Sequence, residues 1–167
     1  MRALEIFFDY SCPFCLKGHT YLKELLAEGV GVDITLVWCP CEAHPRPEEH
    51  GRHSDLTMQG MYYALEKGVD IWAYHDAMYQ AGVTNRADIE DVTVLADYVK
   101  DILDGEDYIS AVESGRYREI QQKGNDYAYK ENGVWAVPSY RMGGRKLDSP
   151  EGVGITKEAL KDFLENG

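Results

Sequence analysis

The sequence has no run of about 18 apolar residues, so it offers no candidate for a membrane-spanning helix. It also lacks an apolar N-terminal segment with a cleavage site, because Met1-Arg2-Ala3 leads directly into a short apolar stretch. Positive charge is scarce: 17 Lys and Arg face 29 Asp and Glu, which gives a formal net charge of −12. Nucleic-acid binders need basic patches and anionic membranes attract cations, so we expect neither as a partner. These absences favour a cytoplasmic protein.

Cysteine is rare as well, with four residues in a chain of 167. A chain of this length with 44% hydrophobic residues can bury a core without a disulfide framework. In a reducing compartment, such isolated cysteines are more often catalytic or metal-binding than structural. The length fits one domain, or a compact core that carries an insertion.

Two of the four cysteines form the motif Cys12-Pro13-Phe14-Cys15. The apolar run Leu4–Phe8 before it predicts a buried strand. The residues after it predict a helix, because one face repeats at the helical period: Cys15, His19, Leu22 and Leu26. Unpaired N–H groups and the positive end of the helix dipole favour a thiolate at the first cysteine. We therefore expect Cys12 to be an exposed nucleophile and Cys15 to be a shielded resolving thiol.

A Cys-x-x-Cys pair is also half of a zinc site, or two ordinary buried thiols. The strand before the pair and the helix after it favour redox chemistry over both of these interpretations. Pro13 fits an early helical position, where the missing N–H costs no hydrogen bond.

A second strand is predicted by the alternation of Val32, Ile34, Leu36 and Trp38 with more polar neighbours. Strand, helix and strand together make a parallel βαβ unit. The motif Cys39-Pro40-Cys41 follows where the second strand ends. Because the carboxyl ends of both strands lie at one edge of the sheet, we expect Cys39 and Cys41 to lie near Cys12.

No strand pattern occurs between residues 55 and 129, and apolar residues recur there at helical spacing. Asp88 is the expected N-cap of one of these helices. The sequence thus predicts a core from residues 1–54 and 130–167, with an all-α insertion at 55–129. A loop at 40–54 precedes the insertion, and its histidines have no fixed ligand spacing and are expected on the surface: His44, His50 and His53.

Strand character returns from Gly133 to Tyr140. The pair Gly143-Gly144 predicts a hairpin turn between strands at Ser139–Met142 and Arg145–Leu147. Thr156 is the expected N-cap of a last helix.

The chain resembles DsbA-type thioredoxin-fold proteins. The resemblance rests on the segment Phe8 to Cys15, on the central helical insertion and on Val137-Pro138-Ser139 before the late hairpin. Within the family it is similar to the cytoplasmic branch of FrnE-like oxidoreductases and 2-hydroxychromene-2-carboxylate isomerases. The resemblance implies an α/β fold: a thioredoxin-like core, with a central mixed sheet flanked by helices, and an all-α helical insertion.

The resemblance implies a thiol–disulfide oxidoreductase with Cys12 and Cys15 as its redox pair. Pro138 would form a cis peptide bond and face the pair, since proline is the residue that holds a cis bond at low cost. Val137 would present its backbone to an extended substrate, and Pro13 and Phe14 would contact that substrate. Such an enzyme needs no bound cofactor. Its partners would be a disulfide- or dithiol-containing protein, or glutathione as a co-substrate.

Two departures from the family keep alternatives open. The glutathione-dependent isomerases have serine where this chain has Cys12, so retention of both cysteines favours dithiol–disulfide exchange. The Cys39-Pro40-Cys41 motif is not a general family feature. It could be a second redox pair, two idle thiols, or part of a zinc site with the first pair and possibly His44. A glutathione-dependent isomerase or transferase and a zinc-binding non-enzyme therefore remain alternatives, and no metal ligand is assigned.

Overall fold

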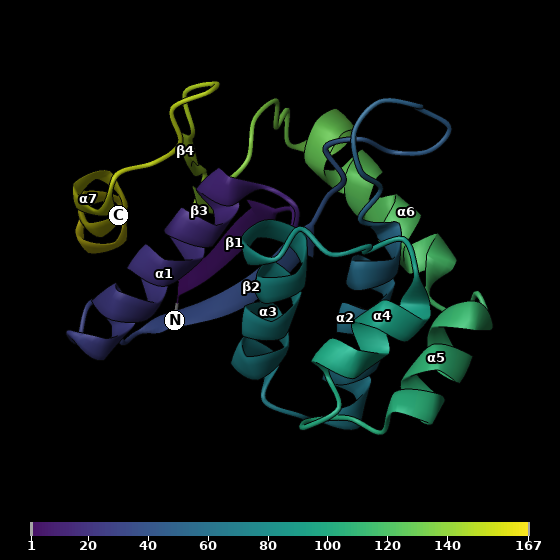
Figure 1. Cartoon of the computed structure of the whole chain (residues 1–167). Coiled ribbons are helices and arrows are strands. Elements are labelled where there is room, and N and C mark those ends of the chain that lie inside the picture. The colour runs from purple at the N-terminus through teal and green to yellow at the C-terminus, as the bar shows by residue number, and fades with distance from the viewer. Residues whose placement is uncertain (1, 167) are drawn as a thin grey trace.

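The computed structural model describes residues 2–166 (Figure 1). A four-stranded sheet has the order β2-β1-β3-β4. Its strands are β1 (Arg2–Phe8), β2 (Ile34–Pro40), β3 (Ser139–Met142) and β4 (Arg145–Asp148). β1 runs parallel to β2 and antiparallel to β3, and β3 is antiparallel to β4. The sheet is therefore mixed, and the expected βαβ unit and late hairpin are both present.

Helices lie on both sides of this sheet and account for the α/β class (Figure 1). Helix α1 connects β1 to β2, and α7 packs against α1 at the opposite end of the molecule from the other helices. No helix among residues 2–166 is long and apolar enough to cross a membrane. The helical segments are α1 (Pro13–Ala27), α2 (Asp55–Lys67), α3 (Ile71–Tyr79), η1 (Gln80–Thr84), α4 (Val92–Tyr98), α5 (Gly105–Glu113), α6 (Arg118–Asp126), η2 (Tyr127–Glu131) and α7 (Lys157–Glu165).

Side-chain caps fix the start of several helices. Thr156 accepts a hydrogen bond from the backbone N–H of Ala159, which confirms its expected role at α7. The prediction that Asp88 caps α4 was wrong. The N-cap is Asp91, whose side chain accepts a hydrogen bond from the N–H of Thr93. Asp88 receives the N–H of Glu90, so it closes the turn before the helix.

The two faces of β1 contact different parts of the core. Leu4, Ile6 and Phe8 lie in the large core, which also contains Cys15 of α1. Phe7 points to the other face, into a smaller cluster with Cys41, Ala128 and Val134. This alternation along β1 decides which cysteines share a face of the sheet.

Two sequence-based strand assignments were too long. Val32 is 82% exposed and precedes β2 in a turn. Residues 133–138 are not a strand, and β3 begins at Ser139, opposite Phe7. The hydrogen-bond ladder with β1 stops at Ser139 because Pro138, the residue before it, has no N–H to donate.

Candidate active site

Cys12 lies at the point where the chain leaves β1 and enters α1. It is the N-cap residue of α1, and its Sγ lies 3.4 Å from the backbone nitrogen of Cys15. A hydrogen bond from the Cys15 thiol lowers the pKa of Cys12, and the N–H groups of Cys15 and Phe14 add to this effect. Partial burial opposes the lowering without reversing it. The Cys15 thiol and, secondly, the N–H groups of Cys15 and Phe14 therefore favour the thiolate of Cys12.

Cys15 lies one turn further along α1 and is 1% exposed. Burial raises its pKa well above the ordinary value, and the hydrogen bond with Cys12 acts in the same direction. The N–H of Asp9 donates to the Cys15 sulfur at 3.5 Å. Both thiols are free in this structure. The pair thus combines a partly exposed thiol of lowered pKa with a shielded thiol of raised pKa.

The segment before β3 passes directly beside Cys12. The Val137–Pro138 peptide bond is cis. The Cys12 thiol lies 3.8 Å from the carbonyl oxygen of Val137 and donates to it. Within residues 2–166, the N–H of Val137 has no hydrogen-bond partner. One donor of this backbone is therefore available beside the Cys12 sulfur.

Gly18 allows α1 to approach this segment closely. A Cβ at position 18 would lie 3.2 Å from Pro138 Cγ and 2.6 Å from the hydroxyl of Tyr140. Any larger residue would push the helix that carries the two cysteines away from Pro138.

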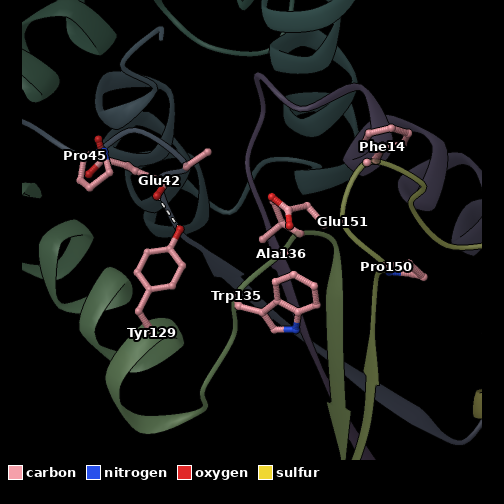
Figure 2. A pocket seen from close by; sticks show the side chains of 11 residues that line it. Phe14, Glu42, Pro45, Tyr129, Trp135, Ala136, Pro150 and Glu151 are labelled. Atoms are coloured by element: carbon pink, nitrogen blue, oxygen red, sulfur yellow. Dashed lines mark hydrogen bonds between the residues drawn. The ribbon is translucent and has the colours of Figure 1, made fainter. Parts of the chain in front are cut away.

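A hollow of about 300 Å³ lies beside Phe14 and Val137 (Figure 2). We call it the Trp135 groove, because the Trp135 side chain is 62% exposed at its wall. The Tyr129 hydroxyl donates to the backbone carbonyl of Glu42 and so ties η2 to the loop after β2. The groove is lined by Phe14, Glu42, Ala43, Pro45, Tyr129, Trp135, Ala136, Val137, Pro150, Glu151 and Gly152. Sequence reasoning missed Trp135 as a surface residue because it placed it in a strand.

A second hollow of about 330 Å³ includes Cys12 itself. It shares Ala43 with the Trp135 groove, so the two hollows adjoin. We call it the arginine hollow, and its lining is Ser11, Cys12, Pro13, Ala43, His44, Gly51, Arg52 and Arg86. Its two arginines come from the loop before α2 (Arg52) and the turn after η1 (Arg86). No sequence signal placed them near Cys12.

Asp9 holds the two flanks of the site together. It is fully buried, and its Oδ1 accepts hydrogen bonds from the N–H of Ser11 at 2.9 Å and from the Ser11 hydroxyl at 2.8 Å. Its Oδ2 accepts the N–H of Ala43 at 2.8 Å. One carboxylate thus fixes both the turn before Cys12 and the loop that follows β2. The sequence motif contained Asp9, but nothing in the spacing assigned it this contact.

The structure does not bring Cys39 and Cys41 to the first pair. Cys39 lies opposite Phe7 in the sheet, and Cys41 packs with Phe7 on the face away from Cys15. Burial raises the pKa of Cys39 to about 12 and also raises that of Cys41. Cys41 does lie at the carboxyl end of β1, where its N–H donates to the Phe8 carbonyl at 2.9 Å, but the sequence pattern predicted the edge of the sheet and not the face.

No zinc-type arrangement is present in the described part of the chain. Among residues 2–166, no group of three or more His, Cys, Asp or Glu side chains could hold a metal ion. The loop histidines have local partners: His44 contacts Glu48 at 2.9 Å, and His53 contacts the His44 carbonyl at 2.8 Å. The expectation that His53 lies on the surface was wrong, because its side chain is only 9% exposed. His50 is exposed.

Two histidines lie beneath the thiol pair. His19 is 8% exposed, and its Nε2 lies 2.8 Å from Asp76 Oδ1, while burial lowers its pKa. His75 is 1% exposed, and its Nδ1 lies 2.8 Å from the hydroxyl of Tyr10. Both line a small cavity that also contacts Cys15. The helical period of the sequence placed His19 on the same face as Cys15, while no sequence pattern placed His75 near the pair.

The mixed sheet, the dithiol at the junction of β1 and α1 and the inserted helices together define a thioredoxin-fold protein with a dithiol site. A family model described as the DSBA-like thioredoxin domain matches residues 3–161. The chain therefore belongs to this family. It is also 24% identical to the uncharacterised protein YwbO of Bacillus subtilis, over 95% of this chain and 96% of that protein.

Solved structures of DsbA-like proteins share this fold. Chlamydia trachomatis DsbA superposes with a TM-score of 0.74 at 19% identity, covering 99% of this chain and 84% of its own. Bacillus subtilis BdbD gives 0.70 at 14% identity, covering 99% and 86%. MdbA, a thiol-disulfide oxidoreductase from Actinomyces oris, gives 0.65 at 20% identity, covering 99% and 81%.

Proposed function

We propose that this protein is a thiol–disulfide oxidoreductase that uses Cys12 and Cys15. The observation that carries the proposal is the position of Cys12: an N-cap thiol of lowered pKa, 3.8 Å from the Val137 carbonyl and backed by a buried second thiol. Nucleophile, resolving thiol and a backbone for the substrate are thus within one small site.

The reaction has two displacement steps. The Cys12 thiolate attacks one sulfur of a substrate disulfide, and the other substrate sulfur leaves as a thiolate that takes up a proton. Cys15 then loses its proton and attacks Cys12 Sγ, which releases the second substrate thiol and leaves a Cys12–Cys15 disulfide. The substrate gains two electrons and the protein loses two. In the oxidising direction the same steps run backwards.

The backbone at Val137 supports binding of an extended substrate segment. Its carbonyl faces Cys12, and its N–H is free within the described residues, as strand addition requires. Pro138, with its cis bond, places this segment against the pair. Pro13 and Phe14 border the two hollows beside it and are proposed to contact the substrate.

We further propose that the protein belongs to the cytoplasmic, FrnE-like branch and works without a bound cofactor. A dithiol protein or glutathione would reset the pair. Cys41 packs in a cluster on the face of β1 opposite to the one that contains Cys15. This separation argues against direct exchange from Cys39 or Cys41 to Cys12. Their high pKa values also make them weak nucleophiles near neutral pH.

The test is a thiol count on the full-length protein equilibrated in glutathione buffers of defined potential. We expect two thiols to disappear together in the wild type and no such paired loss in Cys12→Ser. Cys39→Ser is the matched control and should keep the transition at the same potential. A wild-type protein whose thiols all stay free in the most oxidising buffer would refute the proposal.

A further inference from the structure

The arginine hollow contains two arginines that form no ion pair within the described residues. The chain has 29 acidic and 17 basic side chains, so most cations have an acidic partner within reach. Arg52 and Arg86 form no ion pair with any residue between 2 and 166. Both line the hollow that contains Cys12. Their charges are therefore available to a ligand at the reactive sulfur.

The guanidinium of Arg52 is fixed in place by backbone oxygens. Its Nη1 donates to the carbonyl of Gly82 at 2.5 Å, and its Nη2 donates to the carbonyl of Ala87. Neutral carbonyls orient the group and leave its charge uncompensated. The carboxylates of Asp88, Asp9 and Glu90 act on it only from beyond ion-pair distance.

Arg86 adds a second, exposed charge. It is the non-glycine residue of the described chain with a positive φ, +48°. The turn around it is closed by hydrogen bonds from the N–H of Asn85 to Gln80 and from the N–H of Ala87 to Ala81, both at 2.8 Å. Its charge lies close enough to Arg52 to add to the effect of burial in lowering the pKa of Arg52.

The surroundings of Cys12 differ in charge on its two sides. Among the described residues, no acidic side chain is on the lining of the arginine hollow. Two acids lie behind it: Glu48, which contacts His44 at 2.9 Å, and the buried Asp9, which accepts hydrogen bonds from Ser11 and Ala43. The adjoining Trp135 groove has Glu42 and Glu151 on its wall, and its described lining includes no lysine or arginine. A substrate segment that crosses both hollows would meet cations on one side and carboxylates on the other.

We propose that the arginine hollow binds a carboxylate of the substrate, an Asp or Glu side chain next to the cysteine whose sulfur Cys12 attacks. This inference rests on the proposed oxidoreductase function and names its substrate class. Arg52 supplies a fixed fork of donors, and Arg86 supplies a second charge at the rim. The opposite polarity of the Trp135 groove orients the segment, because an acidic side chain is repelled there by Glu151.

The experiment uses short peptides with one cysteine, flanked on both sides by either Glu or Gln, each as a mixed disulfide with 2-thiopyridine. Attack of the Cys12 thiolate on the peptide sulfur releases pyridine-2-thione, whose absorbance gives the rate of the first step. At about 0.1 M salt we expect the Glu peptide to react about 5-fold faster with the reduced wild type, the size expected of a partly exposed charge pair.

Arg86→Gln should bring the two rates to within about 2-fold by slowing only the Glu peptide. Arg118→Gln is the matched control: Arg118 is also exposed and without an ion pair in the described chain, but it begins α6. This control should retain the wild-type preference, and the Gln peptide should react equally with all three proteins.

Other outcomes separate the two proposals. Equal rates for both peptides with the wild type would overturn the carboxylate subsite and leave the Cys12 chemistry intact. If Cys12 reacts with neither peptide, the oxidoreductase proposal itself fails. Glutathione also has carboxylates, so its pyridyl disulfide is compared with that of its diethyl ester. If the protein prefers glutathione over its diethyl ester but does not distinguish the Glu peptide from the Gln peptide, the hollow binds a small thiol and the proposed peptide substrate is wrong.

Discussion

The stability of the fold should depend on the neutral state of His75. This side chain is 1% exposed and is surrounded by aromatic rings, with its centroid 4.3 Å from that of Trp38. Its Nδ1 contacts the Tyr10 hydroxyl, and its Nε2 has no partner within residues 2–166. Burial, and secondly the charge of His19, lowers the pKa of His75 to about 3.

The direction of the pH effect follows from the two states. Above the ordinary pKa of 6.5, His75 is neutral in the folded and the unfolded chain. Below it, the unfolded chain takes up a proton that the folded chain does not bind until about pH 3. Each pH unit in this window removes about 1.36 kcal/mol from the free energy of unfolding. His75 alone should therefore cost about 2 kcal/mol on going from pH 7 to pH 5.

Urea unfolding of the wild type and of His75→Gln at pH 7 and pH 5 measures this cost. Glutamine can still bond to Tyr10 but does not titrate, so the variant should lose about 2 kcal/mol less than the wild type over the same pH change. His50→Gln removes an exposed histidine and should behave as the wild type does. If the wild type and His75→Gln lose equal stability, His75 is not held neutral in the folded protein.

Three further outcomes follow from the site. Gly82→Ala should lower the free energy of unfolding by about 1–3 kcal/mol in denaturant titrations, because its Cβ would lie 2.4 Å from the backbone oxygen of Tyr10; unchanged stability would contradict that packing. In the reduced protein near neutral pH, iodoacetamide should alkylate Cys12 well before Cys39, because the pKa of Cys12 is lowered and that of Cys39 is raised. Peptide mass analysis measures the two extents of labelling, and equal labelling would count against Cys12 as the nucleophile. Trp135→Ala should leave the unfolding curve unchanged, since the ring is 62% exposed. It should slow thiol exchange with aromatic-containing peptides about 5-fold, because the ring can no longer contact them. An equal slowing with a small neutral disulfide would exclude such a contact.

The local order of the site could be predicted from the sequence. An apolar run, two cysteines and a helical period are all neighbours in the chain, and they place Cys12 and Cys15 at the strand-to-helix junction without knowledge of the tertiary structure. The same local logic identified Thr156 as a cap. The same logic predicted Asp88 and not Asp91 as the cap of α4. Both acids precede the same apolar pattern, and only the backbone geometry of the folded chain distinguishes them.

What could not be predicted depends on contacts between distant segments. The edge of the sheet where Cys41 lies follows from the βαβ rule, but its face depends on how the chain leaves β2 after Pro40. Arg52 and Arg86 line the same hollow as Cys12 only because the loop after β2 and the turn after η1 meet there. Neither residue belongs to a motif, and hydrophobic periodicity carries no information about exposed cations.

Net charge and local charge lead to different conclusions about the substrate. A chain of net charge −12 repels an acidic partner at long range, so composition alone argues against acidic substrates. This repulsion is screened beyond about 8 Å at physiological salt, whereas a carboxylate held against Arg52 is inside that distance. Arg52 can act in this way because carbonyls, not carboxylates, orient its guanidinium. The acidity of the whole protein is therefore compatible with the proposed anion-binding site beside Cys12, in which the few side chains around the sulfur would select the substrate.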